Sequence, residues 1–306
     1  MEIFITGGSG FIGSYLCRLL LEQEHSVTVL SRSADKARIL PKGVGLCLGD
    51  PTQPGPWQDE AARHQGFINL AGASIFVRWT EEYKKAIEES RVSSTRNLVQ
   101  ALAKRDTDKP AVLVSASAVG YYGFRDDEEI DETGEPGDDF LAHLCRKWEA
   151  EAIRAEDYGA RVVRARFGIV LGKKGGALAQ MLPLFKKGLG GPLGSGRQWF
   201  SWIHQKDLTE ALVFCMENPA LKGAVNCTSP HPLTNQNLAK ALGRALGRPA
   251  FLPAPALAVK LALGEFGSVL LKGQRVMPQA LLQAGFSFAF PTIDEALADL
   301  LAETDA

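Results

Sequence analysis

Hydrophobic residues in the first three quarters of the chain fall into short, nearly continuous runs that alternate with amphipathic stretches of helical length. The runs are EIFIT (2–6), SVTVLS (26–31), GLCLGD (45–50), GFINLAG (66–72), AVLVSAS (111–117), ARVVRARFGIVLG (160–172) and AVNCTSP (224–230). Runs of this kind are typical of parallel strands that helices cover on both faces. The pattern therefore predicts an α/β fold built on a doubly wound parallel sheet.

The segment after the first run has the spacing of an amphipathic helix. Its apolar side chains recur three and four residues apart, at Ile12, Tyr15, Leu16, Leu19 and Leu20. A second apolar run follows within a few residues, so residues 1–31 form one strand–helix–strand unit of ordinary length.

TGGSGFIG (6–13) joins the first strand to this helix, and three of its four glycines, Gly7, Gly10 and Gly13, are spaced three residues apart. In that context Gly7 permits a tight turn, Gly10 lets backbone approach a diphosphate, and Gly13 allows the helix to pack closely on the strand. The positive end of the helix then faces the phosphates. The sequence therefore predicts a dinucleotide site, although a glycine turn without a ligand has the same residues.

The end of the second strand indicates which dinucleotide is bound. Sites for NAD usually carry Asp or Glu there, whereas VTVLSRS ends in Ser31, Arg32 and Ser33. No carboxylate repels a 2′-phosphate, and Arg32 offers a planar pair of donors to it. We therefore expect NADP(H) as the cofactor; the alternative is an arginine that is merely exposed in a loop.

Composition and charge narrow the function further. The 306 residues contain 34 Lys and Arg against 35 Asp and Glu, a net charge of −1, so we expect neither nucleic acid nor a membrane as partner. The five cysteines and five histidines are dispersed, which predicts reduced thiols and no metal site. No apolar stretch is long enough to span a bilayer, and we expect a cytoplasmic protein, monomeric or homodimeric.

The motifs follow one another as in a known family. GGSGFIG, Asp50, NLAG (69–72), SASAVGYYG (115–123), WEAEA, RFGIVLG (166–172) and WIHQKDL (202–208) occur in this order. In this the chain resembles the extended short-chain dehydrogenase/reductases. LFKKGLGGPLGSGRQWFSWIH, GQRVMP and AGFSF resemble an atypical subgroup, the epimerase-family or cell-division-inhibitor-like proteins.

The resemblance covers nearly the whole chain and implies two domains. A Rossmann domain would comprise residues 1–170 with a returning segment near 203–228. A smaller substrate-side domain would comprise 171–202 and 229–306. The resemblance also implies chemistry by a Tyr whose phenolate is stabilised by a Lys four residues later, with help from a Ser near a strand end.

That Tyr–Lys pair is missing, because no tyrosine in the chain is followed by Lys at the fourth position. Alignment through the WEAEA helix places Leu141 at the position of the Tyr and Cys145 at that of the Lys. Lys147 is no obvious substitute, since two helical residues rotate a side chain by about 200°. We expect Cys145 to be a core thiol on the apolar stripe of this helix.

The candidate residues follow from these arguments. The expected cofactor contacts are Gly7, Ser9, Gly10, Phe11, Ile12, Gly13, Ser31, Arg32, Asp50, Leu70, Ala71, Gly72, Ser115 and Arg166. The candidate catalytic residues are Ser117 and Tyr121. The expected substrate-side residues are Tyr122, Arg197, Trp199 and Trp202. A phenol without a nearby cation is a poor general base at neutral pH. For both Tyr121 and Tyr122, aromatic packing at the rim of the pocket is therefore an alternative of equal weight to a catalytic role.

Two segments bear on the substrate side. The loop GLGGPLGSGRQWFSWIH (188–204) is rich in glycine and aromatics, so Arg197 could pair with an anionic group while the tryptophans wall a pocket or anchor the loop. The acidic segment FRDDEEIDETGEPGDD (124–139) is expected to be a solvated loop. In WIHQKDL, Asp207 is expected to cap the next helix.

Two functions remain open from the sequence. The first is an NADP(H)-dependent oxidoreductase or nucleotide-sugar-epimerase-like enzyme that acts on an unidentified small molecule. The second is an NADP(H)-binding regulatory or redox-sensing protein with weak turnover. Loss of the Tyr–Lys pair favours the second, whereas the aromatic loop favours a small-molecule pocket and hence the enzyme, which we prefer.

Overall fold

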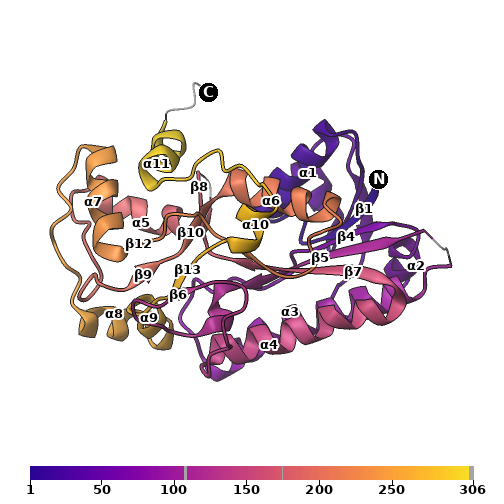
Figure 1. Ribbon diagram of the computed structural model, residues 1–306, viewed down its shortest axis with the longest axis horizontal. Coiled ribbons are helices and arrows are strands. Elements are labelled where there is room, and N and C mark those ends of the chain that lie inside the picture. The colour runs from indigo at the N-terminus through magenta and orange to yellow at the C-terminus, as the bar shows by residue number, and fades with distance from the viewer. Residues whose placement is uncertain (107–108, 174, 303–306) are drawn as a thin grey trace.

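The computed structural model describes residues 1–106, 109–173 and 175–302. A seven-stranded, all-parallel sheet forms its centre, with the strand order β11-β7-β5-β4-β1-β2-β3 (Figure 1). Its strands are β1 (Glu2–Thr6), β2 (Ser26–Ser31), β3 (Gly45–Leu48), β4 (Gly66–Asn69), β5 (Ala111–Ala118), β7 (Ala160–Phe167) and β11 (Gly223–Cys227). Because the order runs outward in both directions from β1 and β4, the predicted doubly wound α/β fold is confirmed.

Helices cover both faces of this sheet. One face carries α1 (Phe11–Glu22) and α6 (Gln205–Glu217), whose apolar stripes bury Leu16, Leu20 and Leu212 against the strands. The other face carries α2 (Trp57–Ala61), α3 (Glu81–Ala103) and α4 (Phe140–Ile153). Figure 1 shows α3 and α4 running together beneath the sheet. Three short 3₁₀ helices connect these layers: η1 (Ala34–Ile39), η2 (Val119–Tyr122) and η3 (Arg154–Tyr158).

A smaller part of the chain lies beyond the carboxyl ends of the strands. Its helices are α5 (Gly176–Lys186), α7 (Asn235–Leu246), α8 (Ala256–Leu263), α9 (Glu265–Leu270), α10 (Gln279–Gln283) and α11 (Ile293–Leu301). Three two-stranded pairs join it to the rest: β10 (Trp202–His204) with β8 (Ile169–Gly172), β12 (Leu233–Thr234) with β9 (Trp199–Phe200), and β13 (Arg275–Val276) with β6 (Glu129–Ile130). The domain boundaries expected from the sequence stay a prediction.

Parallel pairing brings the carboxyl ends of β1, β2, β4, β5 and β7 to one edge of the sheet. Ligands of doubly wound folds bind at this edge, in the crevice where the strand order reverses. Most of the candidate site residues predicted from the sequence lie on the segments that follow the strands at this edge of the sheet.

Candidate functional site

The glycine turn after β1 has the close contacts that the sequence predicts. Gly7 has a φ of +73°, and a Cβ there would lie 2.6 Å from the carbonyl carbon of Leu70. A Cβ on Gly13 would lie 2.4 Å from the carbonyl oxygen of Gly7. Gly10 is the N-cap of α1, which has no side-chain cap and no acidic residue in its first turn. The first amides of α1 therefore face no competing anion, which fits a phosphate group.

A buried hydrogen-bond network fixes the floor beneath this turn. The Asn69 side chain accepts a bond from Thr6 Oγ1 at 2.6 Å and donates to Thr95 Oγ1 at 2.7 Å and Ser115 Oγ at 3.3 Å. Ser115, an expected cofactor contact, is only 1% exposed. Its side chain therefore supports the floor of the site and does not face a ligand, which corrects that expectation.

The other residues expected at the dinucleotide line the same crevice. Ser9, Phe11, Ile12 and Leu70 are half-buried, Ala71 is buried and Gly72 is exposed. The Phe11 ring carries contacts that the sequence did not indicate: Cβ atoms on Gly172, Gly175 and Gly176 would lie 2.4, 2.5 and 3.2 Å from it. The start of α5 therefore packs directly on the start of α1, which only residues without side chains permit.

The end of β2 exposes Arg32. Ser31 beside it is buried and donates its hydroxyl to the carbonyl oxygen of Ser33 at 3.0 Å. Arg32 forms no ion pair with the described residues. Asp50 accepts bonds from the amide and hydroxyl of Thr52 at 2.9 and 2.7 Å. Burial raises the pKa of Asp50, but these bonds and the nearby charge of Arg32 outweigh it and lower the pKa below its usual value.

A buried carboxylate on α4 forms a charged network under the end of β5. Glu149 is 3% exposed and accepts bonds from the Arg166 guanidinium at 2.8 and 3.0 Å and from Arg164 at 3.0 Å. Ser117 donates its hydroxyl to the same carboxylate at 2.7 Å. We name these four residues the Glu149 clamp. Two cations and one anion leave it a net positive charge, and Ser117 and Arg166 are held inside it, away from the catalytic and cofactor-contact roles expected of them.

Tyr122 lies in the core, contrary to its expected place on the substrate side. It is fully buried, accepts a bond from Arg166 Nη1 at 2.9 Å and donates to the Asn226 side chain at 2.7 Å. Burial raises the pKa of this phenol to about 12, although the Arg166 charge opposes the shift. Tyr122 is therefore a structural anchor for the turn after β5.

Tyr121 has the opposite surroundings. It is half-buried, and its hydroxyl bonds to none of the described residues. The Arg166 guanidinium carbon lies 3.5 Å from the centre of its ring, and the Tyr122 ring stands at 84° to it. A search for Lys four residues after a Tyr cannot find this cation, because Arg166 lies on β7 and meets the turn after β5 through strand pairing, in which it is the partner of Ser117.

Leu141 and Cys145 lie on α4 as the sequence predicts. The Cβ of Leu141 is 3.2 Å from the position that a Cβ on Gly120 would take, so it packs against the turn that carries Tyr121. Cys145 is 2% exposed, and its thiol donates to the carbonyl oxygen of Ala118 at 3.7 Å. Burial raises its pKa to about 12.

We expect Cys145 to be inert towards thiol reagents in the folded protein, because both its burial and its raised pKa suppress the reactive thiolate. Mass spectrometry after brief alkylation at neutral pH should find Cys145 unmodified while Cys47 reacts, because Cys47 is partly exposed even though burial raises its pKa as well. Rapid modification of Cys145 would contradict its placement. Lys147 on the same helix instead forms an exposed ion pair with Glu88 at 2.8 Å.

A small hollow of about 110 Å³ lies near the turn after β5, although Tyr121 is not among the residues that line it. Its walls are Trp79, Phe124, Asp139, Phe140, Leu141, Glu265, Ser268, Val269 and Lys272. Five of these nine side chains are aromatic or aliphatic and three are charged, a mixture found in sites for small organic molecules. Trp79 and α9 were missed by the sequence reasoning, because neither belongs to a recognisable motif.

The glycine-rich loop supplies fewer pocket residues than the sequence suggests. Trp202 is fully buried and donates its indole N–H to the carbonyl oxygen of His231 at 3.1 Å, so it anchors the loop. Trp199 is half-buried and donates to Asp127 at 2.8 Å, with Arg275 4.9 Å from its ring. Arg197 is exposed. Trp202 therefore does not wall a pocket, and a substrate contact by Arg197 or Trp199 stays a prediction.

The expectation that Asp207 caps α6 is wrong. His204, not Asp207, caps α6, because its Nδ1 accepts the amide of Lys206 at 3.0 Å. Asp207 is buried and accepts the amides of Ala289 and Phe290 at 2.7 and 3.0 Å, while burial raises its pKa to about 6. It therefore ties the C-terminal segment to α6.

The acidic segment also differs from the solvated loop expected. Its Glu132 accepts the amides of Asn226 and Ala280 at 3.0 and 3.1 Å, and burial raises its pKa. The segment is thus fastened to the sheet and to α10. Among the described residues no cluster of three or more His, Cys, Asp or Glu could hold a metal ion.

Comparisons with known proteins agree with this geometry. The model of the NAD dependent epimerase/dehydratase family matches residues 3–227, and a domain of unknown function, DUF1731, matches 254–300. The chain is 41% identical over 301 residues to the chloroplastic SDR39U1 homolog of Arabidopsis thaliana, covering 97% of this chain and 86% of that protein. It is 38% identical to the epimerase family protein YfhF of Bacillus subtilis, covering 99% of each.

A solved structure is similar over the same length. The human epimerase family protein SDR39U1, crystallised with NADPH, superimposes with a TM-score of 0.86 at 36% identity. The alignment covers 98% of this chain and 99% of the human one. The likeness therefore extends through the smaller C-terminal part as well as the sheet.

Proposed function

Because the chain belongs to the NAD dependent epimerase/dehydratase family, we propose that it is an NADP(H)-dependent oxidoreductase acting on a small carbonyl or hydroxyl compound. One observation carries this proposal: the Arg166 guanidinium carbon lies 3.5 Å from the centre of the Tyr121 ring, so this cation would take the part of the missing lysine. The hydroxyl of that tyrosine bonds to none of the described residues, and Leu141, which packs against Gly120 of the same turn, lines a hollow of about 110 Å³.

The residues of this chain fit the dinucleotide with which the human relative was crystallised. The uncapped start of α1 would hold the diphosphate, and the backbone contacts of Gly7 and Gly13 leave no room for side chains there. Exposed Arg32 would bind the 2′-phosphate. Asp50 lies close enough to Arg32 for the arginine charge to lower the pKa of Asp50. When bound, the reduced cofactor supplies a hydride for the carbonyl carbon.

Tyr121 would supply the matching proton. As its O–H donates to the carbonyl oxygen of the substrate, negative charge develops on the phenolic oxygen, and the adjacent Arg166 stabilises that charge. The Glu149 clamp holds Arg166 in place, and Leu141 and Trp79 supply apolar walls of the hollow. Solvent then restores the proton, and an alcohol is the product. In the reverse direction the same groups accept the proton.

The size and lining of the hollow favour a small substrate. Sites for drug-sized ligands enclose about 300–1,000 Å³, so a volume of about 110 Å³ suits a compact carbonyl compound better than a nucleotide sugar. A panel of small aldehydes and ketones, incubated with NADPH deuterated at its transferable position, tests this. Mass spectrometry should find deuterium in the alcohol product. Tight NADPH binding without deuterium transfer to any of these compounds would favour the regulatory alternative.

Arg32→Ala should weaken NADPH binding by about one to two orders of magnitude, since a charge-assisted hydrogen bond contributes about 1.5–3 kcal/mol. NADH lacks the 2′-phosphate, and its affinity should barely change. Calorimetric titration of both reduced cofactors into wild type and variant measures this. Arg63→Ala, which removes an exposed arginine two residues after α2, is the matched control and should change neither affinity. An NADPH preference that survives Arg32→Ala would place the discrimination elsewhere.

A further inference from the structure

Two long segments, which include most of the smaller part and the strands β7 and β11, contain no acidic residue. Neither 158–206 nor 218–264 includes a single Asp or Glu, although the whole chain carries a net charge of −1. Exposed cations project from both segments at Lys186, Lys187, Lys240, Arg244, Arg248 and Lys260. These segments therefore carry an excess of positive charge that the overall charge balance conceals, although Asp294 and Glu295 of α11 lie beside α7.

The same segments expose large apolar side chains. Leu257 and Leu261, four residues apart on α8, are 69% and 70% exposed, and Phe251 before them is 73% exposed. Leu252, Leu184 and Leu189 are also exposed. We name the surface formed by these six side chains and the six cations the basic–apolar face.

Backbone contacts join the parts of this face. A Cβ on Gly188, next to Leu189, would lie 3.4 Å from Pro249, and one on Gly191 would overlap the backbone of Leu252. In Figure 1 the chain passes from α7 to α8 along the end of the molecule farthest from the N-terminus. The turn after α5 and the α7–α8 connection therefore share one surface.

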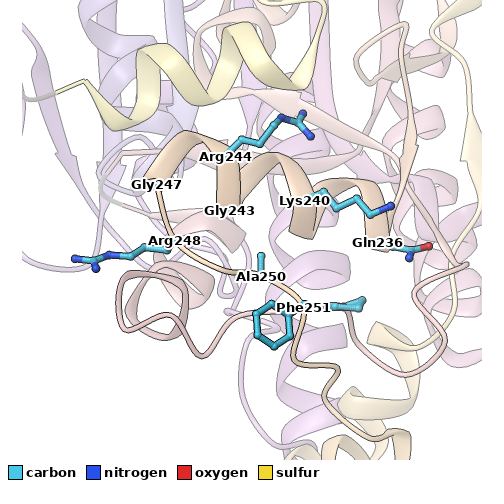
Figure 2. Close-up of a pocket in the computed structure, with 9 residues that line it drawn as sticks. Gln236, Lys240, Gly243, Arg244, Gly247, Arg248, Ala250 and Phe251 are labelled. Atoms are coloured by element: carbon cyan, nitrogen blue, oxygen red, sulfur yellow. The ribbon is translucent and has the colours of Figure 1, made fainter.

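The cations on this face do not converge on a single point. Three of them, Lys240, Arg244 and Arg248, line an open hollow of about 580 Å³ between α7 and Phe251. Figure 2 shows Arg244, Lys240 and Arg248 pointing in different directions from α7 and the loop after it. Arg244 is paired with Asp294 at 2.8 Å, whereas Lys240 and Arg248 form no ion pair with the described residues. An extended anionic surface suits this arrangement better than one small anion.

We propose that the basic–apolar face docks on an anionic lipid bilayer as a peripheral contact. Aliphatic and aromatic side chains would enter the boundary between headgroups and acyl chains, while the surrounding cations meet anionic headgroups. None of the described helices is long and apolar enough to cross a membrane, so the contact would be superficial. The expectation of no membrane partner rested on the net charge of the whole chain. That net charge does not show the local excess of positive charge on this face.

Other occupants fit the face less well. A polynucleotide would bind the cations and stack on Phe251, but the exposed leucines can neither stack on bases nor form hydrogen bonds with them. A second copy related by a two-fold axis would place this same face against itself and oppose like charges. Both remain outcomes of the test.

Sedimentation with vesicles tests the proposal on the full chain. The protein should bind vesicles of phosphatidylcholine and phosphatidylglycerol in equal amounts and should not bind phosphatidylcholine alone. Arg248→Glu with Lys260→Glu should lower the partition coefficient by about tenfold or more, and added salt should weaken binding by wild type. Leu257→Ser with Leu261→Ser should lower it without a change of charge.

Matched controls keep the result specific. Arg18→Glu with Lys85→Glu alters net charge equally at exposed positions of α1 and α3, and Leu282→Ser removes an exposed leucine of α10. These variants should bind as wild type does. Absence of binding to anionic vesicles, or equal losses in the control and test variants, would overturn the proposal. The proposal would also be overturned if the test variants still bound vesicles but lost either concentration-dependent dimerisation or binding to single-stranded DNA.

Discussion

Tyr121→Phe should lower kcat by about 10²–10⁴-fold, the usual contribution of general acid–base catalysis. Phenylalanine keeps the ring against Arg166 and against Tyr122, so the variant removes the hydroxyl and little else. The dissociation constant of NADPH and the melting temperature should stay close to those of wild type. Steady-state NADPH oxidation with the best carbonyl compound of the panel measures the loss.

Two other tyrosines provide controls. Tyr158→Phe removes an exposed hydroxyl and should leave both turnover and stability unchanged. Tyr122→Phe breaks two buried hydrogen bonds and should reduce stability by about 1–3 kcal/mol with a smaller effect on kcat. Full turnover by Tyr121→Phe would show that the proton comes from another group or from water.

The sheet and the glycine turn could be predicted because their signals are local. Strand runs, the helical spacing from Ile12 and the glycines at Gly7 and Gly13 all act over a few residues. The contacts of both glycines with neighbouring backbone show the physical reason for their positions. The apolar stripe that buries Cys145 is equally local, and the structure has it as predicted.

The charge that serves Tyr121 could not be predicted in the same way. Arg166 reaches the tyrosine through the register of β5 and β7, and Glu149 reaches Arg166 from a helix packed beneath. No short sequence motif predicts this contact, because the three residues lie on separate elements: the turn after β5, β7 and α4. For the same reason the sequence assigned Arg166 to the cofactor, although a buried carboxylate holds it.

Errors on the substrate side have a similar origin. Tyr122 and Trp202 were expected at the pocket because they lie near motifs that end at the cofactor edge. The turn after β5 instead folds Tyr122 inward among Val119, Ile130 and Val276. Position in a motif predicts the neighbourhood of a side chain, but the direction of that side chain depends on packing between distant segments.

Glu149→Gln should lower the free energy of unfolding by about 3–5 kcal/mol, because breaking a buried ion pair leaves an uncompensated charge. Glutamine has nearly the same shape, so the lost energy reports the charge and not a cavity. Arg166 would stay buried, with Arg164 beside it and no anion between them. Urea denaturation followed by far-ultraviolet circular dichroism measures the change.

Glu151→Gln is the matched control, since it makes the same substitution on the same helix. Glu151 pairs with Arg96 at 2.6 Å and with Arg154 at 3.3 Å, but these arginine side chains are 46% and 60% exposed, and such pairs contribute about 0–1 kcal/mol. Adding Arg166→Gln to Glu149→Gln should recover part of the lost stability, because it removes the unpaired cation. It should also abolish the turnover that depends on Tyr121. A Glu149→Gln variant as stable as Glu151→Gln would show that the clamp holds no buried charge, and Arg166 would then lack the fixed position from which it acts on Tyr121.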